Sequence, residues 1–332
     1  MTDFTASRRS VLGLLGAGAI GSMLPGRALA QGGASAPLAF GYQNTSWGVL
    51  GMIAEAEDMF KKAGADVTIY KFDGGKTTRD AMIAGRVDIG VFGSTPLIVG
   101  AAKGEVVAIG MAMYAGKTLA VVAGANSGIK SVAELKGKKV GSQVGSTTNN
   151  IFQNKILPAF GLSSSDITTV NVPFPNHISA LASGSIDAFA GVEPYTSLVE
   201  ASDIGKTLVD YSKYDLTPVM VGANLSAIEQ KREAVVAFLR GWLSAVDLVK
   251  KDEAKAMQIV KDNFKGQGFD ISDKAVKLLF SKIDVTPEFT PELVDYLNAE
   301  AKILLDKKQI SAIPDWSKRL DTSLMKEARK AA

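Results

Sequence analysis

The sequence predicts an α/β protein built from two similar lobes that are joined by two extended connections. Three observations predict this fold. The segment AMIAGRVDIGVFGSTP, residues 81–96, has a second copy in ALASGSIDAFAGVEP, residues 180–194. A strand-like and a helix-like segment precede each copy, and extended apolar segments run between the two halves. The chain of 332 residues is also long enough for two domains.

The first thirty residues predict an export signal. Arg8 and Arg9 precede an apolar run at residues 11–24, and the small residues Ala28 and Ala30 follow it. A basic start, a short apolar run and a small-residue exit are typical of a cleaved signal, and paired arginines favour the twin-arginine route. We therefore expect cleavage near Ala30 and a soluble periplasmic protein. A Sec-type signal and an N-terminal anchor are the alternatives.

The composition excludes several kinds of site. The chain has no cysteine, which excludes disulfides, cysteine nucleophiles and zinc–thiolate sites, and His177 is its one histidine. Residues 31–332 hold 34 basic and 33 acidic side chains, a net charge of +1. They show no basic stripe with interleaved aromatic residues, so we expect no nucleic-acid partner. We also expect no metal and no cofactor.

The two halves of the chain predict the same order of elements. Periodicity and turn residues place them as strand 38–42, polar loop 43–48, helix 49–62 and strand 67–72 in the first half, and as strand 138–142, loop 145–148, helix 149–160 and strand 167–174 in the second. Ser131 and Glu134 predict a capping box for a short helix before the second set.

The repeated segment predicts a helix, a buried strand and a loop in each half. The helix is expected to end at Gly85 or Gly184, since glycine accepts the left-handed conformation of a helix stop. Asp88 or Asp187 then begins the strand, and the loop at residues 93–96 or 191–194 follows. Chance similarity between two units is the alternative explanation.

Two extended segments, residues 118–124 and 217–223, are predicted to cross between the lobes and to form a hinge that closes around a ligand. The first lobe is expected at residues 37–122 and 219–332, and the second at residues 123–218. The last part of the chain predicts helices that pack on the first lobe, at residues 227–248, 253–264, 273–280, 291–307 and 316–328.

Several motifs resemble those of periplasmic substrate-binding proteins of ABC importers, in the branch for nitrate, taurine and aliphatic sulfonates. They are GYQ at residues 41–43, AGRVDIGVFGSTP, VAELKGKKVG and SGSIDAFAGVEP. The resemblance covers essentially the whole chain after the export signal. It implies the two-lobed type II periplasmic-binding-protein fold with a two-strand hinge, and a membrane ABC permease as partner. We expect the protein to act as a monomer.

The sequence departs from this family at two places. Many relatives have an aromatic residue before the Glu-Pro pair, where this chain has Val192. The pyrimidine-synthesis relatives carry a cysteine cluster, and this chain has no cysteine.

The stretch VGSQVGSTTNNIF, residues 140–152, predicts an anion-binding loop. Gly145, Ser146, Thr147 and Thr148 would offer backbone amides at a helix start together with hydroxyl donors. A nucleotide-binding P-loop would need a lysine where Ser146 stands, so that interpretation fails. An ordinary helix cap is the alternative.

The other candidate ligand residues follow the ends of other predicted strands, where α/β sheets bind their ligands. They are Gln43, Ser46, Trp47, Phe72, Asp73, Ser94 and Thr95 in the first lobe, and Phe174, Asn176 and Glu193 in the second. Trp47 is a candidate to stack on a ligand or wall the cleft. Glu193 is a candidate to accept from a cationic group such as an amine, or to hold its own loop.

These observations predict a receptor that captures a small organic anion between its lobes and delivers it to the permease. A sulfonate such as taurine or an alkanesulfonate is the expected ligand, with nitrate or a pyrimidine precursor as alternatives. Asp73, Glu193 and His177 are the titratable candidates for an exported α/β enzyme, and nothing in the sequence pairs them. We therefore expect no catalytic residue and no enzyme activity.

Overall fold

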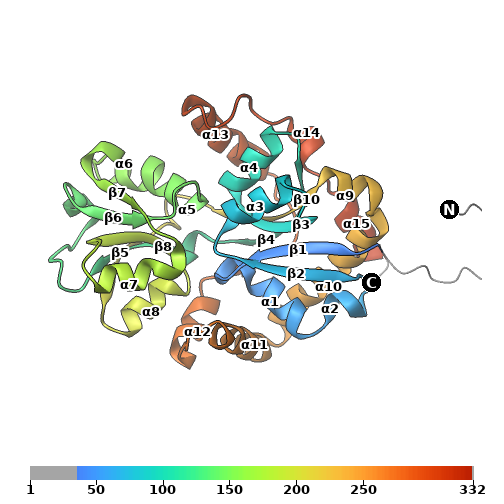
Figure 1. The fold of residues 1–332 in the computed structure, drawn as a ribbon, viewed down its shortest axis with the longest axis horizontal. Coiled ribbons are helices and arrows are strands. Elements are labelled where there is room, and N and C mark those ends of the chain that lie inside the picture. The colour runs from blue at the N-terminus through green and yellow to red at the C-terminus, as the bar shows by residue number, and fades with distance from the viewer. Residues whose placement is uncertain (1–35, 331–332) are drawn as a thin grey trace, which may run out of the picture. The chain divides into compact units, whose positions relative to one another are not determined.

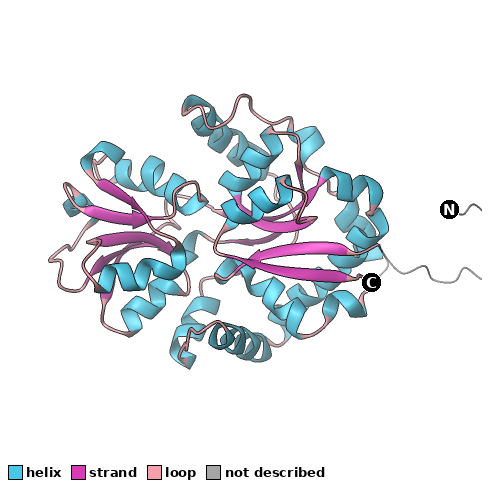
Figure 2. Ribbon diagram, in the orientation of Figure 1, coloured by secondary structure: helices cyan, strands magenta, loops and turns pink. Residues whose placement is uncertain are grey.

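The structure is a computed structural model that describes residues 36–330. The predicted export signal and its cleavage near Ala30 lie outside these residues. The described residues belong to one compact unit, in which two β-sheets each carry helices on their faces (Figures 1 and 2). The predicted two-lobed α/β fold is confirmed. We call each sheet with the helices packed on it the first and the second lobe.

The two sheets have the same topology. The first has the strand order β11-β4-β10-β3-β1-β2, formed by Asp284–Val285, Val106–Tyr114, Pro218–Asn224, Ile89–Gly93, Leu38–Gln43 and Val67–Phe72. The second has the order β9-β5-β8-β6-β7, formed by Gly205–Asp210, Leu119–Gly124, Ala188–Val192, Lys139–Ser142 and Thr168–Asn171. In each sheet β1 or β6 lies parallel between two other strands, and β10 or β5 pairs antiparallel with the next strand on one side and with β4 or β9 on the other. The first sheet has one further edge strand, β11, which pairs antiparallel with β4.

The chain crosses between the lobes twice, through residues 115–118 and 211–217. The extended segments predicted as crossings lie mostly in β5 and β10, because their apolar residues fill the middle of each sheet. The crossings are joined to each other, since Ala115 N donates to Thr217 O at 2.9 Å and Tyr211 N donates to Gly116 O at 3.2 Å. The predicted limits of the lobes in the sequence stay predictions.

The repeated glycines end two equivalent helices, α3 (Gly75–Ile83) and α7 (His177–Ala182). Gly85 and Gly184 both have φ of 71°, the left-handed conformation that the repeat predicted. No atom lies within 4 Å of a Cβ built on either glycine, so the backbone conformation and not the packing selects glycine there.

The repeated aspartates tie each buried strand, β3 or β8, to its parallel neighbour, β1 or β6. Asp88 Oδ2 accepts from Ala39 N at 2.8 Å, and Asp187 Oδ2 accepts from Lys139 N at 2.7 Å. The same bond at the same place in both sheets gives the repeat its physical basis.

The predicted loop at residues 93–96 is wrong, and the one at residues 191–194 is reduced to a two-residue turn. Helix α4 (Ser94–Ala102) begins directly after β3, because the extended backbone of Gly93 turns the chain straight into the helix. Helix α8 (Tyr195–Ala201) follows β8 after only Glu193 and Pro194. The candidate residues of both segments therefore lie in or beside the first turn of a helix.

Two other predicted features of the first part of each half differ in form. The helix at residues 49–62 is preceded by a 3-10 turn, Ser46–Gly48, and is split into α1 (Val49–Ala56) and α2 (Met59–Lys62) because Asp58 is left-handed, with φ of 52°. The capping box is absent in the 3-10 turn η3 (Val132–Leu135), where Ser131 makes no cap bond and the Glu134 carboxylate accepts from Lys130 N at 2.9 Å.

The helix predicted at residues 149–160 begins earlier, and its middle is a π-helical turn. It runs through α5 (Thr147–Ile151), the π turn Phe152–Ile156 and α6 (Leu157–Ala159). Pro158 follows the π turn and has no N–H for the helical ladder. The next strand, β7, is shorter than predicted, and the 3-10 turn Phe174–Asn176 lies beyond it.

The C-terminal helices pack against both lobes, and not only against the first. They are α9 (Leu225–Gln230), α10 (Arg232–Lys251), α11 (Glu253–Gly266), α12 (Asp273–Phe280), α13 (Leu293–Asp306), α14 (Trp316–Arg319) and α15 (Ser323–Lys330). Helix α10 packs on the first sheet and on α2, since the Phe238 ring lies 4.8 Å from the Phe40 ring of β1 and stacks on the Phe60 ring of α2, with centroids 4.4 Å apart. Helix α12 instead contacts α8 of the second lobe, which corrects the prediction.

Candidate functional site

The two lobes meet where the parallel strands of both sheets end. Ser46 N, after β1, donates to Glu193 O, after β8, at 2.8 Å. Tyr195 Oη donates to Asn44 O at 3.1 Å beside it. We call this meeting place the seam.

The first turns of α4 and α5 also meet across the seam. Thr95 N donates to Thr147 Oγ1 at 3.0 Å. A Cβ built on Gly93 would lie 2.5 Å from Thr147 Oγ1, so the close approach of the two helices needs a glycine there. A Cβ on Gly74, before α3, would lie 2.6 Å from Gln143 Nε2 of the second lobe, but this is the end of a flexible side chain that can move aside.

Trp47 forms a wall of the seam. Its ring is 5% exposed, and its Nε1 donates to Thr118 Oγ1 in the first crossing at 3.0 Å. A Cβ on Gly93 would lie 2.7 Å from the ring. The indole is thus held between β3 and the crossing, and this fixes the ring at the place where the lobes join.

Buried oxygen atoms without hydrogen-bond partners gather on the segments that form the seam. Among residues 36–330 no partner exists for Gln43 Oε1, Asn44 Oδ1, Ser46 Oγ, Thr95 Oγ1, Ser142 Oγ, Thr148 Oγ1, Asn149 Oδ1 and Thr196 Oγ1. Five of these atoms are hydroxyls, two from the first lobe and three from the second. A buried hydroxyl without a partner costs about 1–3 kcal/mol, so such a group points to a bound molecule that supplies acceptors.

The side-chain amide of Gln43 has a fixed orientation. Its Nε2 donates to Val91 O and lies 3.4 Å from Thr78 Oγ1. A carbonyl only accepts, so the amide group must face Val91 and the oxygen must face the other way. Gln43 is 1% exposed, and its Oε1 therefore needs a donor.

Glu193 is fully buried and engaged with its own lobe and with the C-terminal segment. Its carboxylate accepts from Ser197 Oγ at 2.8 Å and from Ser197 N at 3.2 Å, and it pairs with Lys282 Nζ. These contacts match the alternative in which Glu193 holds its own loop. Its contact with a cationic ligand group stays a prediction.

The other predicted residues of the second lobe take different positions. Gly145 is left-handed, with φ of 85°, and Ser146 caps α5 by accepting from Asn149 N at 3.1 Å. Phe174 is buried with its ring centroid 5.5 Å from that of His177, and Asn176 is exposed.

Besides Trp47, three predicted residues of the first lobe lie outside the group of partnerless oxygen atoms. Phe72 packs over Gly41, where a Cβ would lie 2.8 Å from its ring. Asp73 is exposed, and Ser94 Oγ lies 3.4 Å from Tyr296 Oη of α13.

Sequence reasoning missed four members of the partnerless group and two residues that support the seam. The missed residues are Asn44, Ser142, Asn149 and Thr196, together with Thr118 and Gln143. Ser142 ends β6, and Thr196 lies in the first turn of α8. A rule that took every polar residue within a few positions of a strand end would have found all of them except Asn149, which lies inside α5.

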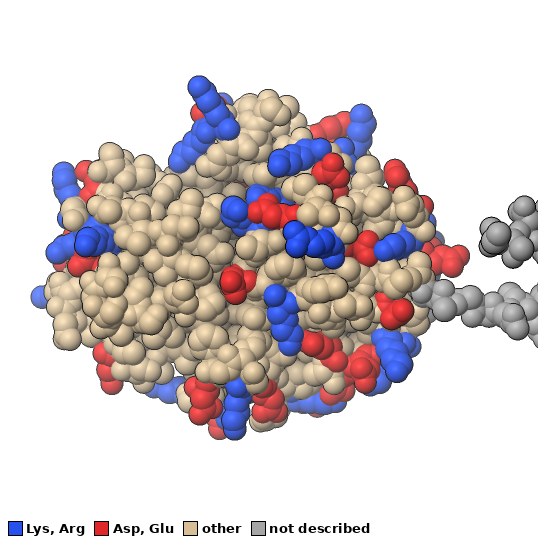
Figure 3. Space-filling view, viewed as in Figure 1, with Lys and Arg blue, Asp and Glu red and all other residues tan. Residues whose placement is uncertain are grey.

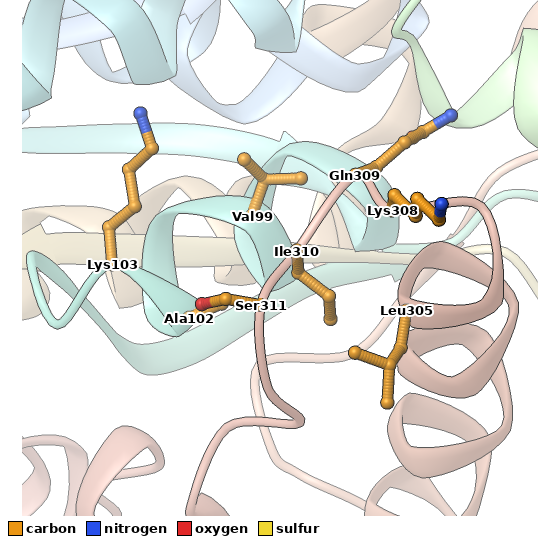
Figure 4. A pocket seen from close by; sticks show the side chains of 8 residues that line it. All are labelled: Val99, Ala102, Lys103, Leu305, Lys308, Gln309, Ile310 and Ser311. Carbon is orange, nitrogen blue, oxygen red and sulfur yellow. The ribbon is translucent and has the colours of Figure 1, made fainter.

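A pocket of about 490 Å³ lies elsewhere, between α4 and the segment that follows α13 (Figure 4). Its lining consists of Val99, Ala102, Lys103, Leu305, Lys308, Gln309, Ile310 and Ser311. It contains none of the partnerless oxygen atoms and none of the predicted ligand residues. It is therefore not the candidate site.

His177 is a structural residue in the second lobe. Its ring is fully buried, Nε2 lies 3.0 Å from Val172 O, and the Phe189 ring centroid is 4.7 Å away. Burial lowers the pKa of His177 from its ordinary value of 6.5 to about 4, although the bond to Val172 opposes this.

The protein is therefore expected to lose stability as the pH falls from 6.5 towards 4. The unfolded chain binds a proton at His177 in this range and the folded chain does not, so the free energy of unfolding decreases with falling pH. Urea unfolding at about pH 7 and about pH 5 should show a loss from this residue of about 2 kcal/mol. His177→Gln keeps a donor for Val172 O and removes the titration. An equally steep pH dependence in that variant would refute the assignment.

Charged side chains of both signs are interspersed over the face of the molecule in Figure 3. Within residues 36–330, no helix is long and apolar enough to span a membrane. The same residues contain no group of three or more His, Asp or Glu side chains placed to hold a metal ion.

The model of the NMT1/THI5-like family matches residues 49–256, which is more than half of the chain. The chain belongs to the NMT1/THI5-like family. Its similar relatives include the putative aliphatic sulfonates-binding protein of Bacillus subtilis, 32% identical over 208 residues that make up 62% of each chain. The taurine-binding periplasmic protein of Escherichia coli is 31% identical over 160 residues, 48% of each chain. The chain thus matches less than two thirds of the length of these relatives.

Solved structures similar to this NMT1/THI5-like protein share its fold. The alkanesulfonate-binding protein SsuA from Xanthomonas axonopodis pv. citri has a TM-score of 0.77 at 20% identity, over 86% of this chain and 98% of that chain. The nitrate-binding protein NrtA from Synechocystis has a TM-score of 0.67 at 16% identity, over 89% and 88%. The predicted family and the periplasmic-binding-protein fold are confirmed.

Proposed function

We propose that the protein is an extracytoplasmic solute-binding protein that captures a small organic anion between its lobes and delivers it to a membrane ABC permease. The observation that carries the proposal is the group of five partnerless hydroxyls at the seam, which come from both lobes. Hydroxyls donate to anionic oxygen atoms, and contacts available only when both lobes meet make ligand binding favour closure. The protein would act as a monomer.

A sulfonate fits these donors. Its three oxygen atoms accept several hydrogen bonds at once, and it stays ionised throughout the physiological pH range. Two lysines close to the seam are paired with carboxylates: Lys282 with the buried Glu193, and Lys76 with Asp80 in an exposed pair. Neutral donors would therefore bind the anion, as in ligand sites that use a few well-placed polar groups. The names of the sulfonate-binding and taurine-binding relatives support the same ligand class.

The partnerless oxygen of Gln43 favours a ligand that also carries an N–H or O–H group. An anionic oxygen cannot satisfy Gln43 Oε1, because both atoms are acceptors. Taurine has a sulfonate at one end and an ammonium at the other, so it supplies both requirements. Glu193 is less suited to the ammonium, since Lys282 already neutralises its charge.

The test is calorimetric titration and thermal unfolding of the protein without residues 1–30, with taurine, ethanesulfonate, nitrate and hydroxymethylpyrimidine. A sulfonate at a hundred times its dissociation constant should stabilise the protein by about 2.7 kcal/mol. Binding of nitrate or the pyrimidine without any sulfonate would refute the ligand class. Chemical conversion of a bound compound would favour the alternative of an exported enzyme.

Taurine is expected to bind more tightly than ethanesulfonate, which has the same sulfonate and chain length but no ammonium. Hydrogen bonds to charged groups contribute about 1.5–3 kcal/mol, so the expected difference is roughly tenfold or more. Gln43→Leu should remove most of this preference and leave ethanesulfonate binding nearly unchanged. Equal affinities of the original protein for the two compounds would contradict the role of Gln43.

A further inference from the structure

A buried polar network lies behind the seam and connects the first turn of α4 with α5. Its six members are polar, come from both lobes and from the second crossing, and form one chain of contacts in the order Ser94, Tyr296, Asp215, Lys155, Glu300 and Asn150. We call it the six-residue network. Its two ends lie next to residues that carry partnerless atoms, Thr95 and Asn149.

The centre of the network is an ion cluster with one lysine and two carboxylates. Lys155 Nζ lies 2.7 Å from Glu300 Oε1 and pairs with Asp215. The same amino group lies 5.1 Å from the centroid of the Tyr296 ring. The side chains of Asp215 and Glu300 are fully buried, and that of Lys155 is 27% exposed. Such a cluster is stable only while its members stay together, since a buried carboxylate that loses its cation is strongly unfavourable.

Neutral groups complete the chain of contacts on both sides of the cluster. Tyr296 Oη donates to Asp215 Oδ1 at 2.8 Å and lies 3.4 Å from Ser94 Oγ. Asn150 Nδ2 donates to Glu300 Oε2 at 3.0 Å. Asp215 Oδ1 also accepts from Thr217 N at 2.6 Å, which anchors it in the crossing.

The members come from segments that separate when the lobes part. Tyr296 and Glu300 lie four residues apart on one face of α13. Helix α13 packs on α4 of the first lobe. Asn150 and Lys155 belong to the helix of the second lobe, where Asn150 lies in α5 just before the π turn and Lys155 lies within it. A π turn bonds residues five apart, so it brings these two positions towards the same face. The network can therefore be complete only when α13 and α5 are in contact.

The charges of the cluster depend on this contact. Burial acts to lower the pKa of Lys155, but Asp215 and Glu300 raise it above its ordinary value. Burial raises the pKa of Glu300, although Lys155 opposes the shift. Separation of the lobes would take Lys155 away from Glu300 and expose both.

We propose that the six-residue network is a latch that stabilises the closed arrangement of the lobes, with Tyr296 and Glu300 as positioning residues that do not touch the ligand. The effect on closure stands on the geometry of the network. Its further effect, slower release of a captured anion, rests on the proposed function.

The test uses Tyr296→Phe and Glu300→Gln, which keep the volume of each side chain. Lys302→Met, on the exposed side of the same helix, is the control. The chain has no cysteine, so Lys136→Cys in the second lobe and Lys250→Cys in the first can carry a pair of fluorescent dyes. Both lysines are exposed.

The variants are expected to shift the dye distance of the protein without ligand towards the separated lobes. They should also raise the dissociation rate constant of taurine about tenfold and leave its association rate constant within about twofold. The control should match the unchanged protein in both measurements. The dye distance of the ligand-free protein tests the latch without any ligand. If no sulfonate binds, this result would refute the proposed function but not the latch. An unchanged dye distance in both variants, with or without a lower melting temperature, would overturn the latch.

Discussion

Replacement of Gly93 by alanine is expected to weaken ligand binding by about 10- to 100-fold. A Cβ at this position would lie 2.5 Å from Thr147 Oγ1 of the opposite lobe and 2.7 Å from the Trp47 ring, so the lobes could not come as close together. Overpacking of this kind should raise the free energy of the closed arrangement by about 1–3 kcal/mol. The backbone of Gly93, with φ of −74° and ψ of 175°, suits alanine, so each lobe should still fold.

Calorimetric titration with taurine and with ethanesulfonate measures this effect, and the dye pair at positions 136 and 250 measures closure. Gly266→Ala is the matched control, because a Cβ there meets no atom within 4 Å and the residue is the last of α11. An affinity equal to that of the unchanged protein would show that the lobes need no close approach at Gly93.

Thr148→Val is expected to raise the dissociation constant of a sulfonate by roughly 10- to 100-fold, because a hydrogen bond to a charged group contributes about 1.5–3 kcal/mol. Thr148 is fully buried, and its hydroxyl has no partner among the residues that the structure describes. Removal of a buried hydroxyl without a partner should leave the stability of the ligand-free protein unchanged or slightly higher. Weaker binding without a loss of stability is the expected combination.

Urea unfolding without ligand and titration with ligand separate these two effects. Thr168→Val, at an exposed position of β7 in the same lobe, controls for the change of a threonine to a valine. A loss of ligand-free stability in Thr148→Val, with unchanged affinity, would identify the hydroxyl as a structural group and remove it from the site.

Much of the fold could be predicted from local patterns. Gly85 and Gly184 stop two helices because the left-handed backbone at a helix end selects glycine whatever the surroundings. The paired spacing to Asp88 and Asp187 then revealed two equivalent units. The break between α1 and α2 could not be predicted in this way, because the left-handed residue at the break is Asp58 and not a glycine.

The candidate site could be predicted only in part. The positions after strand ends pointed to Ser46, Thr95 and Thr148, which keep partnerless hydroxyls. The same rule gave Asp73 and Asn176, which are exposed. Proximity to a strand end is a property of the chain, but the presence or absence of a hydrogen-bond partner depends on what folds against it.

The sequence by itself determined the duplicated α/β architecture, the family and several of the segments that meet at the seam, because each can be recognised from short local motifs. The tertiary structure alone decided the roles at the seam. In the folded protein, Glu193 pairs with Lys282 and Lys155 pairs with Glu300. The Thr147 hydroxyl accepts a hydrogen bond from the backbone N–H of Thr95. These contacts link residues that are far apart in the sequence, and burial at the meeting of two lobes gives them their strength.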